Sequence, residues 1–247
     1  MSNVRQGPSN GPADFFNSIP PITRAWMAGC VLAVAAPELG ILNLRTFILS
    51  WGAVFSHFQI WRLVTNFFVL HGRQWNTLFK LLWMFQYGKA LEGATFQHDP
   101  AQYAFMLLFG ACTTLAMALA VPVCNSMPVH GPDLVFFLMY VWSREYPTQT
   151  VNIMGVVSLE AFYLPFAFAT IDLVAGGNWI SSLMGILAGH LWFYLTKVHP
   201  TAGRYLQAPN WLRRGLDSLG LSRFSGNTGP AAPPTNSAFR GQGRRLG

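Results

Sequence analysis

Long apolar stretches separated by short polar segments dominate the chain. A helix rises about 1.5 Å per residue, so about 20 mostly apolar residues are needed to cross the hydrocarbon layer of a membrane. Four stretches meet this requirement with at most one internal charge: 25–44, 101–123, 148–171 and 178–196. Each is therefore predicted to be a membrane-spanning helix.

Two further apolar stretches are weaker candidates. The stretch 74–91 contains Lys80 and Lys89, and the stretch 134–143 is too short to cross a bilayer alone. The second would need to extend back through 130–132, or to be shielded by its neighbours. With both included, the pattern predicts an all-α membrane protein with six transmembrane helices.

The connection 41–73 between the first two predicted spans is rich in aromatic residues but interrupted by basic ones, such as Arg62 next to Trp61. Such a segment is too apolar to stay in water and too polar to cross lipid. We expect it to lie half-embedded at the membrane interface.

The chain divides into a polar leader at 1–14, a membrane domain at 15–200 and a tail at 201–247. Within the tail, apolar residues recur at roughly helical spacing over 210–220, which predicts a short surface-lying helix. The segment 222–238 is rich in Gly, Pro, Asn and Ser and is predicted to be a disordered spacer.

Composition and charge agree with a membrane protein. Hydrophobic residues make up 52% of the chain and charged residues only 10%, which argues against a soluble domain. The net charge of +7 lies in 197–247, because acidic and basic residues balance over 1–196. Six spans place both termini on the same side of the membrane. Basic segments next to a span stay on the cytosolic side, so the tail assigns both termini to the cytosol. This distribution also argues against a nucleic-acid-binding surface.

A search for catalytic or metal-binding residues gives a negative expectation. The span serines Ser143, Ser158, Ser181 and Ser182 lack a glycine setting that would open an oxyanion pocket, and the G-x-S-x-G pattern at 7–11 lies in the polar leader. The three cysteines have no C-x-x-C spacing. We expect no enzymatic activity, no metal and no cofactor.

The sixth predicted span contains a small-residue packing motif beside an ionisable group. Gly185 and Gly189 form G-x-x-x-G and precede His190. Glycines at this spacing let another helix approach closely, so His190 is expected to hydrogen-bond across that contact. Glu160 is expected in the middle of the fifth span, facing protein or water.

Several motifs, in order, resemble the Derlin family, the endoplasmic-reticulum relatives of rhomboid proteases. They comprise 15–24, Trp61-Arg62 with Thr65 and Asn66, 140–144 and 163–165. The resemblance implies a rhomboid-like six-helix bundle and a pseudoprotease, with His190 where rhomboids keep their sixth-span base. It also implies that Trp61, Arg62, Thr65 and Asn66 perturb lipid or contact substrate.

The last residues of the chain carry a separate motif. Phe239, Gly241, Gly243 and Leu246 match the pattern F-x-G-x-G-x-x-L of the SHP box at 239–246, with which some Derlins recruit the AAA ATPase known as valosin-containing protein. A Phe and a Leu on an extended peptide offer two apolar anchors, and the glycines let its backbone lie in a groove.

The function implied by this resemblance is endoplasmic-reticulum-associated degradation. The protein would help misfolded lumenal or membrane proteins return to the cytosol by thinning the bilayer and recruiting the ATPase. Its other implied partners are membrane lipid and a membrane ubiquitin ligase complex, and a homo-oligomer stays open. Two alternatives remain: an active rhomboid-type serine peptidase, and a solute transporter with Glu160 and His190 along its path.

Overall fold

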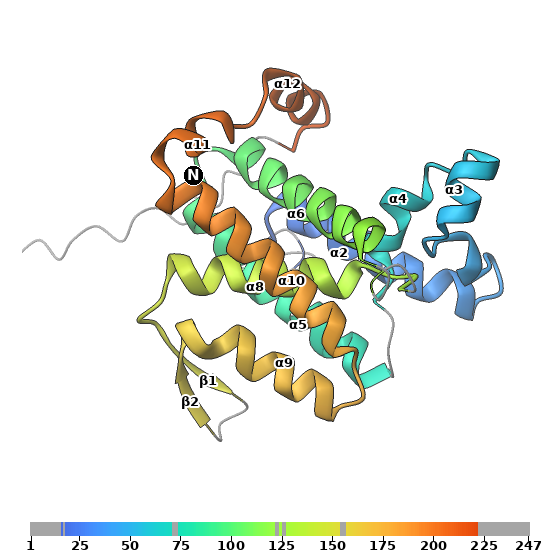
Figure 1. Ribbon diagram of the computed structural model, residues 1–247, viewed down its shortest axis with the longest axis horizontal. Helices are drawn as coiled ribbons and strands as arrows, with labels where there is room; N and C mark the ends of the chain where they lie inside the picture. Colours follow the sequence, from blue (N-terminus) through green and yellow to red (C-terminus); the bar gives the residue numbers. More distant parts are fainter. Residues whose placement is uncertain are drawn as a thin grey trace, which may run out of the picture.

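The computed structural model describes residues 16, 18–70, 74–121, 124, 127–153 and 157–221. Helices dominate this part of the chain, and five of them form a bundle (Figure 1). The bundle helices are α2 (Pro21–Glu38), α5 (Gln74–Ala90), α6 (Pro100–Ala120), α8 (Gly131–Glu145) and α10 (Trp179–Phe193). A shorter helix, α9 (Leu164–Val174), packs beside α8 and α10.

Helix α8 is the centre of the bundle. Its residues from Gly131 to Ser143 are all buried, which is the behaviour of a helix that is apolar on every side and fully surrounded. Aromatic rings pack around it. Trp83 of α5 lies edge-on to Phe136 at 5.9 Å and packs on Phe168 of α9 at 4.4 Å between ring centroids. The weak sequence stretch 134–143 is thus extended at both ends and shielded by its neighbours.

The helix starts show local sequence signals. Asp99 precedes α6, accepts a hydrogen bond from the Gln102 amide at 3.2 Å, and is followed by Pro100 at the first helical position. Asn178 caps α10 in the same way through the Ile180 amide at 3.0 Å. Helices α5 and α10 each continue into a π-helical turn, Leu91–Thr95 and Tyr194–Val198 respectively.

The predicted fifth span is wrong over its first half. The chain forms an antiparallel hairpin of β1 (Thr150–Ile153) and β2 (Val157–Glu160), with Thr150 opposite Glu160. Helix α9 starts only at Leu164, after a 3-10 turn, Ala161–Tyr163. The segment 150–160 is rich in β-branched residues, which favour strands. Glu160 is accordingly exposed at the end of β2 and not in the middle of a span.

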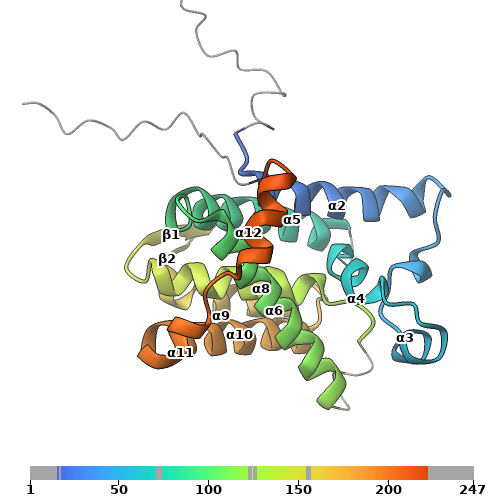
Figure 2. The same cartoon turned by 90° about the horizontal axis from the view of Figure 1, so that it is seen from above.

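The connection between α2 and α5 forms a lobe that projects sideways from the bundle, as both views show (Figures 1 and 2). We call residues 41–70 the lateral lobe. It consists of a 3-10 turn (Leu44–Thr46), α3 (Trp51–His57), α4 (Arg62–Thr65) and a second 3-10 turn (Asn66–Phe68). The tail contributes α11 (Pro200–Tyr205) and α12 (Asn210–Ser218), and α12 packs against α6.

The outer surface of the bundle is apolar. Large hydrophobic side chains are exposed on every outer helix, among them Val31, Leu32, Leu82, Leu108, Leu119, Phe166, Leu183, Leu187 and Leu191. A surface of this kind is suited to lipid. By length and composition, α6 is the one described helix able to cross a membrane, and Ala161–Val174 is a shorter apolar segment. The count of six spans therefore stays a prediction.

Candidate functional site

The lateral lobe is held in shape by the side chain of Arg62. Its Nε donates to the Gln59 side chain at 2.6 Å, and its Nη1 donates to the carbonyl oxygens of Arg45 and Ile48. A planar guanidinium can serve several acceptors at once, which an ammonium group does less well. Arg62 therefore joins α4 to the chain segment that precedes α3.

Two other residues of the loop motif also bind backbone. Thr65 donates to the Phe47 carbonyl at 3.0 Å, and the Asn66 amide donates to the carbonyls of Arg62 and Leu63 at 2.6 and 2.9 Å. Asn66 is fully buried. Trp61 differs, because half of its surface is exposed. In this motif, three residues build the lobe and Trp61 is presented at its surface.

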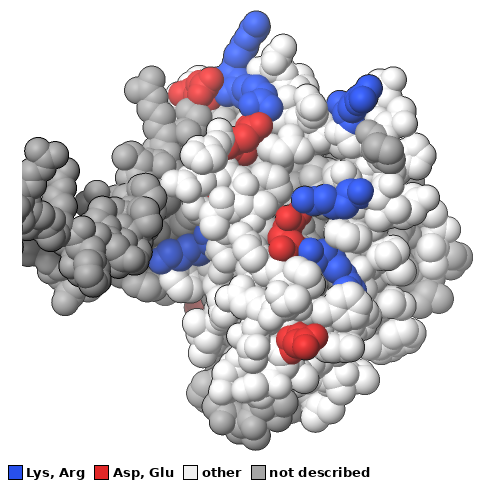
Figure 3. Space-filling model, turned by 90° about the vertical axis from the view of Figure 1, so that its left-hand side faces the viewer, with Lys and Arg blue, Asp and Glu red and all other residues white. Residues whose placement is uncertain are grey.

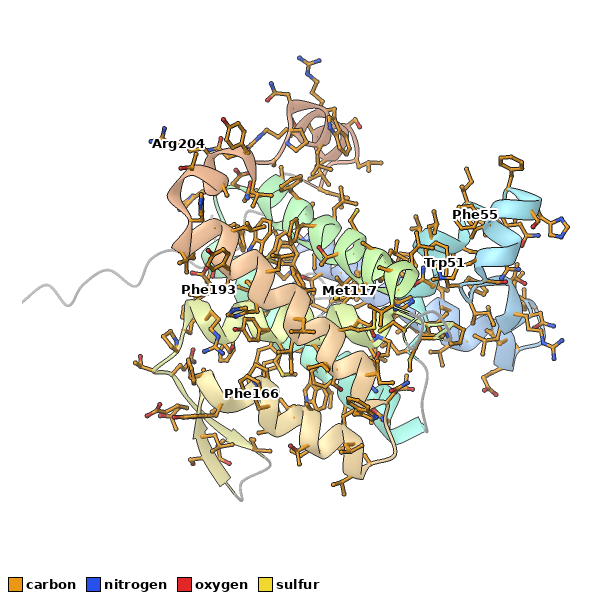
Figure 4. The ribbon with its side chains drawn as sticks, in the orientation of Figure 1. Trp51, Phe55, Met117, Phe166, Phe193 and Arg204 are labelled. Atoms are coloured by element: carbon orange, nitrogen blue, oxygen red, sulfur yellow. The ribbon has the colours of Figure 1, made fainter. Side chains whose placement is uncertain are left out.

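Apolar side chains cover much of the outside of the lobe. Trp51 and Phe55 lie on the projecting lobe (Figure 4), where their rings stack with centroids 5.9 Å apart and Phe55 is 63% exposed. Phe58 is 80% exposed and has a positive φ of 52° at the end of α3. An apolar patch on a projecting lobe favours contact with lipid or with another apolar chain.

Helices α8 and α10 approach each other closely at the two glycines of the G-x-x-x-G motif. A Cβ atom on Gly185 would lie 2.6 Å from the Phe136 Cβ, and one on Gly189 would lie 2.8 Å from the Tyr140 Cβ. Beside this contact, Nδ1 of His190 lies 2.8 Å from the Tyr140 hydroxyl. The structure thus brings Gly185, Gly189 and His190 together against one face of α8.

Within the described residues, no hydrogen bond joins His190 to any of the four serines considered as nucleophiles. Ser143 donates to the Tyr140 carbonyl at 2.7 Å, and Ser181 donates to Asp133. Ser182 lies 3.4 Å from Asp172, and Ser158 is on β2. The three serines in helices are therefore engaged with a carbonyl or a carboxylate.

Two buried charged clusters were not predicted. The Lys80 ammonium is 2.9 Å from the Asp172 carboxylate, which joins α5 to α9, and 2.6 Å from the side-chain Oδ1 of Asn76. His130 Nδ1 is 2.7 Å from Asp133, whose other oxygen accepts from Ser181. A cavity of about 70 Å³ is bordered by Lys80, Asp172, Ser181 and Asn178 among others. The charges were visible in the sequence, but their pairing was not.

At the opposite end of the bundle, Glu92 binds the start of α2. Its carboxylate accepts from the Ile22 amide at 2.8 Å and from the amide and hydroxyl of Thr23, both at 2.7 Å. Burial raises the pKa of Glu92, whereas these hydrogen bonds and the charge of Arg24 oppose that rise. The carboxylate thus satisfies helix amides that lack a partner within the helix.

The tail is fixed to this same end of the bundle. Arg213 of α12 forms a bidentate ion pair with Asp99, with N–O distances of 2.9 and 2.8 Å. The Gln102 side chain donates to the Leu206 carbonyl and accepts from the Ala208 amide. Leu216 is buried against α6, while Trp211 and Leu219 are exposed. The helix predicted at 210–220 therefore uses one apolar edge for docking. The motif of Phe239, Gly241, Gly243 and Leu246 lies outside the described residues.

Known proteins align with this chain over nearly its whole length. Residues 19–210 match the family model described as Der1-like family. The chain is 36% identical to Derlin-1 of Arabidopsis thaliana and 37% identical to Derlin-1 of Oryza sativa subsp. japonica. Each alignment covers 96% of this chain and 99% of the relative. A probable derlin-2 homolog of Dictyostelium discoideum is 27% identical over 83% of the chain. This chain therefore belongs to the Der1-like family, the family of the Derlins.

Proposed function

We propose that the chain acts in endoplasmic-reticulum-associated degradation, where it promotes the return of misfolded proteins to the cytosol without catalysing a reaction. Membership of the Der1-like family and similarity to Derlin-1 proteins over nearly the full length support a Derlin-like role. In this proposal the bundle lies in the endoplasmic-reticulum membrane with six spans, and both termini face the cytosol.

The observation that carries the mechanism is the shortness of the apolar segment Ala161–Val174. Three residues in a 3-10 turn and eleven in an α-helix extend about 22 Å, whereas the hydrocarbon layer is about 30 Å thick. Phe166, Leu173 and Val174 are exposed on this segment. Lipid that covers these side chains must become thinner, which lowers the cost of moving polar chain across it.

The lateral lobe supports the same mechanism. In the proposed topology it lies at the lumenal interface, where Phe55, Phe58 and Trp61 would enter the headgroup layer. Because Arg62 binds two backbone carbonyls and Gln59, these side chains are presented by a fixed scaffold. The lobe would therefore disturb lipid packing beside the bundle.

The orientation rests on charge. The basic excess of 197–247 follows the last predicted span, and such segments stay on the cytosolic side. The docking of α12 on α6 supports a common side for the tail and for the start of α6. A glycosylation acceptor inserted beside Phe58 should be modified, whereas one placed after Leu221 should not. The reverse pattern would overturn the topology.

The tail would supply the link to an energy source. In the proposal, Phe239 and Leu246 anchor an AAA ATPase of the valosin-containing-protein type, which pulls substrate into the cytosol. A membrane ubiquitin ligase complex would mark the same substrates. The fixed position of α12 supports this arrangement, because it makes the tail leave the bundle from a defined point.

Affinity purification from detergent-solubilised membranes tests the proposal. The double variant F239A/L246A should lose the ATPase while it keeps the ubiquitin ligase, and export of a misfolded reporter should slow. The variant Q242A, at an unconstrained position of the motif, is the matched control and should keep both partners. Equal recovery of the ATPase with the double variant would refute the recruitment step.

A further inference from the structure

The last turn of α8 carries an arginine whose guanidinium lies between two aromatic rings. The Arg144 Cζ is 4.6 Å from the centroid of the Tyr140 ring and 3.9 Å from that of Phe162. Both distances are within the range of cation–π attraction. The two rings therefore hold the plane of the guanidinium group in one position, half-buried beside the start of α9.

This cation has no counter-ion within the part of the chain that the structure describes. The acidic neighbour Glu145 is paired with Lys197 at 3.0 Å, and the described ion pairs do not include Arg144. Its Nε is buried and has no hydrogen-bond partner. The carbonyl end of α8 favours a cation nearby but accepts none of the guanidinium N–H groups. A half-buried cation without a counter-ion is costly, so an anion from outside the chain that reaches the rest of the guanidinium group would stabilise this site.

The surroundings of Arg144 are aromatic and exposed. Phe162 lies against Arg144 and has the Tyr163 ring at 5.2 Å between centroids, and these side chains are 41% and 55% exposed. Phe166, four residues further along the chain, is 48% exposed. Aromatic side chains of this kind gather where a membrane protein meets the headgroup layer. Figure 3 looks onto this end of the molecule and shows a few charged side chains on a largely uncharged face.

We propose that Arg144 binds the phosphate group of a phospholipid at the end of the bundle where the tail begins. An arginine fork matches phosphate oxygens and forms strong charge-assisted hydrogen bonds with them. The exposed rings of Phe162 and Phe166 then contact the acyl chains, which inorganic phosphate lacks. This combination of one unpaired cation and apolar rings favours a lipid over a free anion.

The site is formed before a ligand arrives. The Tyr140 ring that lies against Arg144 is fixed by His190, whose Nδ1 is 2.8 Å from the Tyr140 hydroxyl. The Tyr140 and His190 rings meet edge to face, with an interplanar angle of 84°. Because the platform is already ordered, little conformational entropy is lost on binding. His190 is thus a positioning residue for this site.

Native mass spectrometry of the delipidated full chain tests the inference. The probes are dioleoylphosphatidic acid and dioleoylglycerol, which differ only by the phosphate group. The wild type should bind the phosphatidic acid at least about tenfold more tightly. R144Q should bind both lipids equally. R204Q, at an exposed arginine that points away from the bundle (Figure 4), should behave as the wild type.

Two further measurements keep the inference open to refutation. F162A retains the arginine and should weaken the preference for phosphatidic acid, and its thermal unfolding would show whether the bundle is intact. An unchanged lipid preference in R144Q would overturn the site. Loss of bound phosphatidic acid on addition of millimolar inorganic phosphate would overturn the assignment to lipid. It would show that a free anion occupies the site as well as the lipid does.

Discussion

The phenolic oxygen of Tyr140 on α8 lies 2.8 Å from Nδ1 of His190 on α10. The sequence predicts that this histidine hydrogen-bonds across the contact, and its partner on the facing helix is a phenol. The nearby Ser143 hydroxyl donates to the Tyr140 carbonyl instead. The contact between α8 and α10 thus joins two helices and orders an aromatic ring.

The first prediction concerns the two glycines in that contact. G185A should lower the free energy of unfolding by about 1–3 kcal/mol, because its Cβ would overlap the Phe136 side chain and the α8 backbone. G52A is the control, since Gly52 is in a helix and nothing lies within 4 Å of its Cβ position. Thermal unfolding in detergent measures both variants. Equal unfolding temperatures would contradict the close contact.

The second prediction concerns the buried pair of Lys80 and Asp172. D172L alone should destabilise the protein by about 3–5 kcal/mol, because it leaves the ammonium group without its partner. The double variant K80M/D172L should recover most of this loss, since it removes both charges together. Chemical unfolding of the single and double variants measures the difference. A double variant as unstable as the single one would show that the pair is not coupled.

The third prediction separates the scaffold of the lateral lobe from its surface. R62Q should increase proteolytic cleavage within residues 41–70, because three hydrogen bonds that hold the lobe are lost. W61A should keep the resistance of the wild type, since half of Trp61 is exposed. Both variants should slow export of a misfolded reporter. Unchanged protease resistance in R62Q would contradict the role given to Arg62.

The fourth prediction concerns the docking of α12. R213A should speed hydrogen exchange of the α12 amides by roughly fivefold, which corresponds to about 1 kcal/mol for a partly exposed ion pair. R214A is the control, because the adjacent Arg214 is exposed and changes the charge equally. If the α12 amides exchange at the same rate in both variants, the bidentate ion pair between Arg213 and Asp99 does not fix the tail.

The helices of this fold could be predicted well where apolar runs are long and uniform. The stretch 101–123 corresponds to α6 and 178–196 to α10, because an uninterrupted apolar run has few other ways to satisfy its backbone. The hairpin at 150–160 was missed because its residues are as apolar as a span. Its β-branched residues around Gly155 were the available signal.

The pairings between distant residues could not be predicted. Lys80 and Asp172 are separated by 92 positions, and one sequence does not show which charges meet. The same holds for the loop motif, where the residues at 61–66 were recognised by resemblance. Their division into three residues that bind backbone and one exposed tryptophan follows only from the geometry.

The binding of α2 by Glu92 also has a consequence for biogenesis. The amides of Ile22 and Thr23 find their acceptor about 70 residues later in the chain. When the ribosome has made the first span, that acceptor has not yet been synthesised. In the proposed topology α2 enters the bilayer early, but its start is completed only after α5 has emerged. Assembly of the bundle therefore waits until α5 can pair with α2, and a substitution of Glu92 should delay maturation as well as weaken the finished protein.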